Sequence, residues 1–311
     1  MYRVEVGWAP AFELLVSLKA YVSRSEHQTL ELGAGWVREV RGRLTPELTA
    51  ELAAPRVLRA MNLFDLFDLL AWQCPGEPDP ESFLEWVRAL SLGDLYERVA
   101  PFVLRSHFTV PDDLEGTRQW YLRLLAAWNE QYFAQVDPAV LAGLRSDAAA
   151  KTALIAGMAA DDLVEMASNG VQIAPESVPE VVVLIPQYHY RPWNLFSYYR
   201  NLVLLEYPAD ALPPAVGEPP TGLLRLTRAL SDPSRLRILR LLVDDRRSFT
   251  ELVAMTGLAK STVHHHMVAL RAAGLVRVYD VGGKTATYQL RPDAADDLGN
   301  RLRSYLTPSK V

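Results

Sequence analysis

The chain has 311 residues, of which 50% are hydrophobic and 22% charged, a composition typical of a globular protein with about two domains. Its single cysteine, Cys74, excludes an internal disulfide and a metal site built from several thiolates of one chain. The sequence shows neither a signal-peptide pattern nor an apolar run of about 18 residues, so we expect a cytoplasmic protein without membrane contact.

The net charge of −5 hides an asymmetry between the two ends of the chain. Residues 1–221 hold 17 Lys and Arg against 29 Asp and Glu, whereas residues 222–311 hold 15 against 8. A basic block on an acidic protein suggests a polyanionic partner, although a solvated charged surface would account for the same numbers. Residues 208–220 contain five prolines, which neither a helix nor a central strand accommodates. We therefore predict an N-terminal domain at 1–207, a Pro-rich linker at 208–220 and a C-terminal domain at 221–311.

The N-terminal domain is predicted to be mainly helical with a small sheet, which is an α+β fold. Apolar residues recur at helical spacing in four segments, 9–22, 54–73, 80–99 and 113–136. Short β-rich runs frame these helices at 2–6, 179–186 and 201–207, and we expect the first run to pair with the later two.

An aromatic-rich segment at 186–200, PQYHYRPWNLFSYYR, has two interpretations. In the first interpretation, the segment lines a small-molecule effector pocket, with His189 and Arg191 as polar anchors beside Tyr188, Tyr190 and Trp193. Alternatively, its aromatic rings simply pack on the helices, which the sequence favours. Elsewhere in the chain, the carboxylates of Asp65 and Asp68 lie three residues apart and are expected at a solvated helix edge.

The C-terminal domain opens with two predicted amphipathic helices. Leu223, Leu226 and Leu230 form the apolar stripe of the first. Asp232 followed by Pro233 is typical of a helix N-terminus. Leucines at 236, 239 and 242 then continue the apolar pattern, with an isoleucine at 238 beside them.

Two short helices joined by a glycine turn are predicted next. Ser248 and Glu251 have the spacing of a capping box, and Gly257 stands where a helix end needs a left-handed residue. A second helix then starts near Lys260. This arrangement is a helix-turn-helix.

The second helix has distinct faces at 100° per residue. Val263, Met267 and Leu270 form the inner stripe, and His266 borders it, whereas His265 points outward and His264 lies on a flank. Consecutive histidines diverge by 100°, so this run does not chelate one metal ion within one helix. Small and polar groups mark the exposed N-terminal end.

A β-hairpin completes the domain. Val276 and Val278, then Thr287, Tyr288 and Leu290, alternate in strand fashion around a Gly282–Gly283 turn. A helix-turn-helix followed by such a hairpin makes a winged helix-turn-helix.

Residues 222–291 resemble the ArsR-type winged helix-turn-helix of bacterial transcription regulators. The resemblance rests on Asp232-Pro233-x-Arg235, Glu251-Leu252, Gly257-Leu258, Ser261-Thr262-Val263, His265-His266 and Leu270-Arg271-x-x-Gly274-Leu275-Val276. It implies a recognition helix in the DNA major groove, a wing at the backbone or minor groove, and a homodimer on an inverted repeat that mostly represses. Ala259 replaces the usual Ser or Thr cap, and the cysteine pairs of metalloid sensors are absent.

These patterns predict a DNA-contacting set on the second helix and the wing: Lys260, Ser261, Thr262, His264, His265, Arg271, Arg277, Lys284 and Thr285. Protonation of the histidines would add charge and strengthen binding at lower pH. We expect no catalytic residue, no metal and no cofactor.

The sequence therefore predicts a dimeric, sequence-specific transcription regulator whose N-terminal domain senses a small-molecule effector or provides a dimer surface. Its partner is double-stranded DNA. Two alternatives remain: an enzyme tethered to DNA, in which the N-terminal domain turns over a metabolite, and an interaction module, in which that domain binds a protein.

Overall fold

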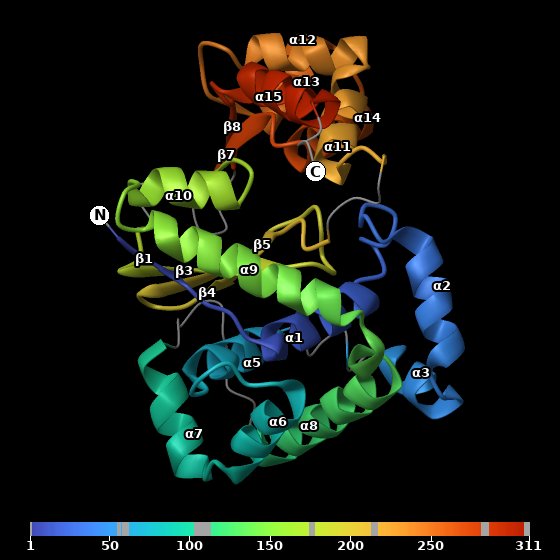
Figure 1. Ribbon diagram of the computed structural model, residues 1–311, viewed down its shortest axis with the longest axis vertical. Coiled ribbons are helices and arrows are strands. Elements are labelled where there is room, and N and C mark those ends of the chain that lie inside the picture. Colours follow the sequence, from blue (N-terminus) through green and yellow to red (C-terminus); the bar gives the residue numbers. More distant parts are fainter. Residues whose placement is uncertain are drawn as a thin grey trace. The chain divides into compact units, whose positions relative to one another are not determined.

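The chain forms two compact units in the computed structural model, which describes residues 2–54, 57, 62–102, 113–173, 178–212, 217–280 and 286–307 (Figure 1). Unit 1 comprises Met1–Leu154 and Pro179–Ala211, and unit 2 comprises Ile155–Val178 and Leu212–Val311. The chain therefore passes between the units three times.

A four-stranded sheet lies at the centre of unit 1. Its strands are β1 (Arg3–Val6), β3 (Val181–Gln187), β4 (Leu195–Tyr198) and β5 (Leu202–Pro208), in the order β1-β3-β5-β4. β1 pairs with β3 and β3 with β5 in parallel, and β4 pairs with β5 in antiparallel. The predicted pairing of the first strand with the later β-rich runs is confirmed.

Unit 1 also contains helices, which lie around this sheet (Figure 1). They are α1 (Pro10–Val22), α2 (Gly33–Arg43), α3 (Pro46–Leu52), α5 (Asn62–Gln73), α6 (Pro80–Ala89), α7 (Leu92–Val99), α8 (Leu114–Gln131) and α9 (Pro138–Leu154), with 3-10 turns at Ala100–Phe102 and Phe133–Gln135. Four of these helices begin with proline, whose fixed φ and missing N–H suit the first helical position.

Both faces of the sheet are buried. Val183 and Ile185 belong to the core that also contains α1 and α8, while Val182 and Leu184 point to the opposite face and are equally inaccessible. Strands buried on both faces are typical of parallel sheets, which explains why β3 is an almost continuous apolar run.

The prediction that Asp68 lies at a solvated helix edge is wrong, because this residue is only 2% exposed. α5 packs against α1 and the sheet, and the Ser197 hydroxyl lies 3.1 Å from carboxylate oxygens of both Asp65 and Asp68. Burial raises the pKa of Asp68 to about 7, although Lys19 opposes the shift. Burial likewise raises the pKa of Glu206 in β5.

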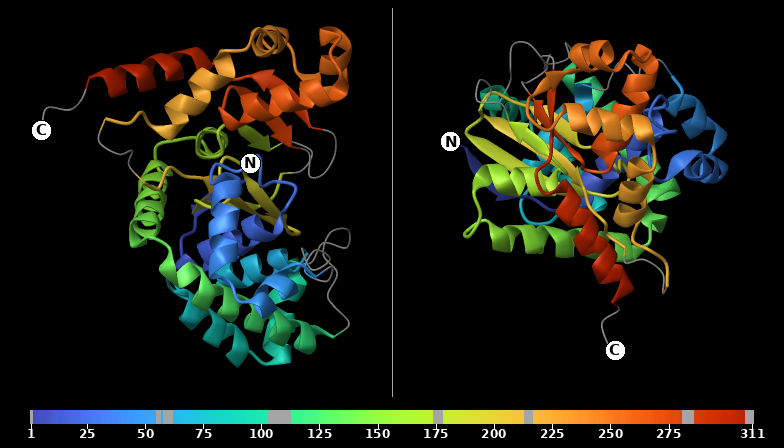
Figure 2. Two further views of the ribbon diagram at one scale, coloured as in Figure 1. Left: turned by 90° about the vertical axis from the view of Figure 1, so that its right-hand side faces the viewer. Right: turned by 90° about the horizontal axis from the view of Figure 1, so that it is seen from above.

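Unit 2 is a winged helix-turn-helix with two additional elements. Its helices are α10 (Ala160–Ala167), α11 (Thr221–Leu230), α12 (Pro233–Leu241), α13 (Phe249–Thr256), α14 (Lys260–Ala272) and α15 (Ala294–Leu306). Its strands, β2 (Val171–Ile173), β6 (Arg247–Ser248), β7 (Val276–Asp280) and β8 (Thr287–Leu290), form a sheet in the order β2-β7-β8-β6. Figure 2 shows the green strand β2 beside the orange strands of the wing. The predicted fold class, mainly helical with a winged C-terminal domain, is confirmed.

The helical stripe predicted for α12 needs one correction. Ile238, Leu239 and Leu242 are buried, but Leu236 is 48% exposed. The core-facing direction lies between Ile238 and Leu239, and Leu236 is more than 100° away from it on the helix.

The two units divide the chain differently from the predicted domain ranges. The last crossing, between Ala211 and Leu212, falls within the segment predicted as the linker. Residues 155–178, however, group with the winged helix, because β2 pairs in parallel with β7. Within the described ranges, no helix combines the length and apolarity needed to cross a membrane.

Candidate nucleic-acid interface

The turn between α13 and α14 is built by local signals that the sequence displays. The Ser248 Oγ accepts a hydrogen bond from the Glu251 N–H, and the Glu251 carboxylate accepts one from the Ser248 N–H at 2.7 Å. Gly257 ends α13 with φ of 66°. The predicted capping box and left-handed turn are confirmed, and together they fix where α14 starts.

α14 presents a polar surface over a buried stripe. Val263, Met267 and Leu270 are buried in the core of unit 2. Five of the predicted DNA-contacting side chains are exposed on the same helix: Lys260, Ser261, Thr262, His264 and His265. Ala259 gives no side-chain cap, so the first N–H groups of α14 remain available to an anion such as phosphate.

The three histidines of α14 have different surroundings. His266 is 8% exposed, and its Nδ1 has no hydrogen-bond partner among the described residues. The His264 ring approaches Phe249 edge-on at 6.3 Å, and His265 is exposed. In the part of the chain that the structure describes, no group of three His, Cys, Asp or Glu residues has the geometry to hold a metal ion.

The other predicted DNA-contacting residues, on the wing and at the end of α14, fall into three groups. Lys284, Thr285 and the Gly282–Gly283 turn lie outside the described residues. Arg271 is half-buried and has an interaction within the chain. Arg277 is held by a carboxylate, since its Nε donates to Glu165 Oε1 at 2.7 Å. This ion pair does not favour the predicted DNA contact of Arg277 in this conformation.

A strap formed by α10 and β2, residues 160–173, holds the base of the wing. Glu165 lies at its centre and is 8% exposed. Its Oε1 contacts Arg277 Nε at 2.7 Å and Arg291 Nε at 3.3 Å, while its Oε2 accepts from Gln172 Nε2 at 2.5 Å. The Glu165 hydrogen bond also raises the pKa of Arg277. One buried carboxylate thus contacts two arginines at the base of the wing and offsets one of their two positive charges.

The backbone of the strap approaches the wing closely. The Val278 N–H donates to the Gly170 carbonyl at 2.8 Å, and β2 continues the sheet beside β7. Gly170 has φ of 113°, and a Cβ there would lie 2.6 Å from the Val276 carbonyl oxygen. Glycine is therefore required at this position. Nothing in the sequence around Gly170 pointed to a partner strand, because Val171 pairs with Val278, which lies 107 residues later.

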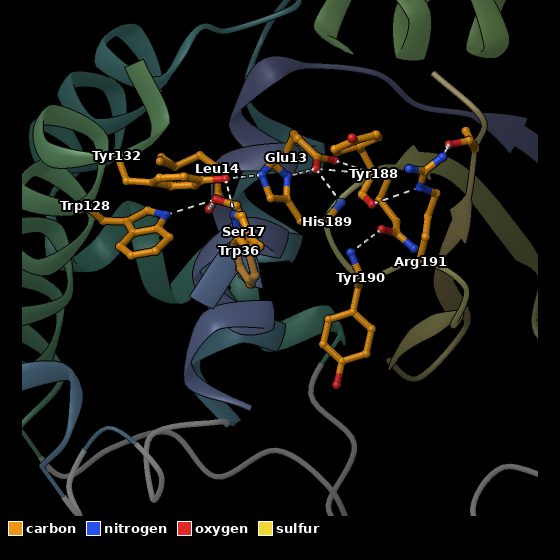
Figure 3. Close-up of polar contacts among 12 residues, drawn as sticks. Glu13, Leu14, Ser17, Trp36, Trp128, Tyr132, Tyr188, His189, Tyr190 and Arg191 are labelled. Atoms are coloured by element: carbon orange, nitrogen blue, oxygen red, sulfur yellow. Dashed lines mark hydrogen bonds and ion pairs between the residues drawn. The ribbon is translucent and has the colours of Figure 1, made fainter. Parts of the chain in front are cut away.

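The residues predicted to anchor an effector have partners inside unit 1 (Figure 3). His189 is 1% exposed and lies between Glu13 and Tyr132, with its Nδ1 against Glu13 Oε1 and its Nε2 2.6 Å from the Tyr132 hydroxyl. Trp36 Nε1 donates to the same hydroxyl at 2.7 Å. This chain of hydrogen bonds is sealed within the core.

The remaining members of that set are similarly engaged. Arg191 contacts Asp210 at 3.1 Å and Glu31 at 3.5 Å, and its guanidinium lies 4.1 Å from the centre of the Tyr188 ring. Tyr190 is buried, and Trp193 Nε1 donates to Thr29 Oγ1 at 3.0 Å. These contacts match the packing interpretation of the segment. A cavity of about 720 Å³ in the same unit is lined by other residues.

Comparison with known proteins identifies the C-terminal region. The family profile "Bacterial regulatory protein, arsR family" matches residues 232–278. The HTH-type transcriptional regulator CmtR, from Mycobacterium bovis and Mycobacterium tuberculosis, is 43% identical over 70 residues. Residues 232–278 thus resemble the DNA-binding domain of the ArsR family, and the unit that contains them folds as a winged helix-turn-helix.

This match covers a minor part of the chain. The 70 residues are 22% of this chain and 58% of CmtR, so the chain spans little more than half of that relative's length. Among solved structures, an ArsR-like transcriptional regulator from Rhodococcus sp. RHA1 is 27% identical, with coverage of 26% of this chain and 76% of that one and a TM-score of 0.25. NolR from Sinorhizobium fredii is 26% identical, with coverages of 31% and 97% and a TM-score of 0.24.

Proposed function

We propose that the protein is a cytoplasmic, sequence-specific transcription regulator that binds an inverted-repeat operator as a homodimer and represses by occluding a promoter. The observation that carries this proposal is the exposed polar start of α14, where Lys260, Ser261 and Thr262 surround an uncapped helix N-terminus. Such a helix end offers N–H and hydroxyl donors to phosphates and base edges.

Charge supports the choice of DNA as the partner. Residues 222–311 carry a net charge of +7, whereas the rest of the chain carries −12. A positive module on an acidic protein directs a polyanion to the module and away from the remainder.

Two helices of unit 2 provide the proposed dimer surface. α11 and α15 pack on each other, and α15 exposes Leu302, Tyr305 and Leu306. Burial of these apolar side chains against a second copy would stabilise the dimer. The two recognition helices would then contact successive half-sites about one helical turn apart.

The strap suggests how regulation reaches the wing. An effector bound in unit 1 would favour one of two conformations that differ in the docking of the strap. Release of Glu165 would free Arg277 to contact a phosphate, and docking would hold it in the ion pair. We assign no chemical reaction to the N-terminal unit. The buried chain Glu13–His189–Tyr132 supports this choice, because its groups contact one another and not solvent.

Selection of bound duplexes from a random DNA pool by the full chain tests the function. We expect an inverted repeat with half-sites about 10 base pairs apart. Ser261→Ala and His265→Ala should weaken binding to the selected site by roughly 5- to 150-fold, since a base contact contributes about 1–3 kcal/mol, with smaller effects on random DNA. Enrichment of no sequence, or equal losses on both DNAs, would refute specific recognition.

A further inference from the structure

The cavity of unit 1 is a groove along α9 with an aromatic lining. Trp8, Phe12 and Trp72 line it together with Cys74, Glu77 and Arg145. Its volume of about 720 Å³ falls within the range of 300–1,000 Å³ that is usual for small-molecule sites. We call it the α9 groove.

α9 contributes mostly small side chains to this groove. Ala142, Ser146, Ala149 and Thr152 recur at intervals of three or four residues, so they share one face of the helix. A flat molecule is able to approach the backbone of such a face closely. Aromatic rings elsewhere in the lining then favour an aromatic ring system as the occupant.

The charged residues at the groove are exposed and paired weakly. Arg145 contacts Glu77 at 2.5 Å, but their side chains are 66% and 45% exposed. An ion pair this exposed contributes little to stability, because water screens both charges. A charged ligand can therefore take the place of Arg145 or Glu77 in this ion pair with little loss of stability.

Two features decide the sign of that charge. Trp, Tyr and Phe rings carry negative electrostatic potential on their faces and attract cations. Unit 1 as a whole holds 17 Lys and Arg against 24 Asp and Glu, a net charge of −7, which also attracts cations. A positively charged ligand would take Glu77 and leave Arg145 in solvent.

We propose that the α9 groove binds a planar aromatic cation and is the effector site of this protein. The second half of this proposal rests on the proposed function. α9 ends at Leu154, where unit 2 begins, and the chain continues into α10 and the strap within six residues. A ligand on α9 thus contacts the helix that directly precedes the strap in the chain.

Binding of rhodamine 6G, a planar aromatic cation, to the full chain tests the groove. Fluorescence anisotropy should give saturable binding at least tenfold tighter than that of the anionic aromatic dye 1-anilinonaphthalene-8-sulfonate. Ala149→Phe, which fills the groove from an exposed helix position, should weaken rhodamine binding at least tenfold. Ala150→Phe on the adjacent, equally exposed position outside the lining should change it less than twofold.

The Glu77→Gln variant tests the sign of the ligand's charge. Because Glu77 is exposed, the substitution should leave the fold intact. Rhodamine binding should weaken by three- to tenfold in this variant. Equal effects of the two alanine variants, tighter binding of the anionic dye, or no effect of Glu77→Gln would overturn the proposal.

DNA measurements separate this proposal from the proposed function. Rhodamine 6G should change the affinity of the wild-type chain for its selected operator, and it should not do so in Ala149→Phe. If rhodamine binds the groove but no operator is selected, the proposed function fails and the binding site stands. If an operator is bound and rhodamine is not, the groove assignment fails and the regulator stands.

Discussion

Glu165→Gln removes the negative charge that holds two arginines at the wing while preserving the size of the side chain. Glu165 is nearly buried, and the exposed fractions of the Arg277 and Arg291 side chains are 26% and 18%. A hydrogen bond to a charged group contributes about 1.5–3 kcal/mol, and the partial exposure of the arginines lowers this value. We expect the free energy of unfolding of unit 2 to fall by about 1–2 kcal/mol.

The same change should alter DNA binding in a way that simple destabilisation does not. Arg291 keeps its hydrogen bond to the Gly274 carbonyl at 3.2 Å, whereas Arg277 loses its carboxylate partner. One additional phosphate contact steepens the slope of log K against log salt by about 0.9. The variant should therefore bind DNA more tightly at low salt, with this steeper slope.

Arg277→Gln supplies the control for this measurement. In the wild-type background it should leave the salt slope unchanged, because Glu165 already neutralises Arg277. Added to Glu165→Gln, it should restore the original slope. An unchanged slope in Glu165→Gln refutes the proposed masking of the wing, and a shallower slope in Arg277→Gln alone shows that Arg277 contacts DNA while the strap is docked.

Two further predictions concern stability. Gly170→Ala should destabilise unit 2 by about 1–3 kcal/mol in urea unfolding, because a Cβ there meets the Val276 carbonyl at a positive φ; Gly157→Ala, in open space, is the control, and equal effects would contradict the close approach of the strap. Asp68, with its pKa raised from 3.8 to about 7, keeps its proton in the folded state between these values while the unfolded chain loses it. The thermal stability of unit 1 should therefore fall as pH rises from 4 to 7, and Asp68→Asn should flatten this decline in a pH series of melting curves; an unchanged decline would exclude Asp68 as its source.

Local signals explain what could be predicted from the sequence. The N-cap of α12 at Asp232, the capping box at Ser248 and the turn at Gly257 each depend on residues within four positions. The faces of α14 follow from its 3.6-residue period, which correctly separated His265 from the buried His266. These features needed no knowledge of distant parts of the chain.

The features that could not be predicted depend on contacts between distant residues. Asp68 is three residues from Asp65 in a pattern that also suits a solvated edge, and the packing of α5 against α1 and β4 buries it. The strap is a more extreme case, because β2 has three residues and no periodicity of its own. Arg277 looked like a free wing cation because its partner, Glu165, lies 112 residues earlier.

The strap lowers the positive charge that the winged domain offers to DNA. Arg277 and Arg291 belong to the basic segment that pointed to DNA, yet both contact one carboxylate from the acidic part of the chain. If an effector released Arg277 to a phosphate while Arg291 stayed on the Gly274 carbonyl, the salt dependence would gain about one charge. Between 200 and 50 mM salt, this gain would change the relative affinity by about 3.5-fold at a slope of −0.9 per phosphate. Because Glu165 is 8% exposed, salt screens its hold on the arginines only weakly, so the effect of salt on DNA binding distinguishes docked from released straps.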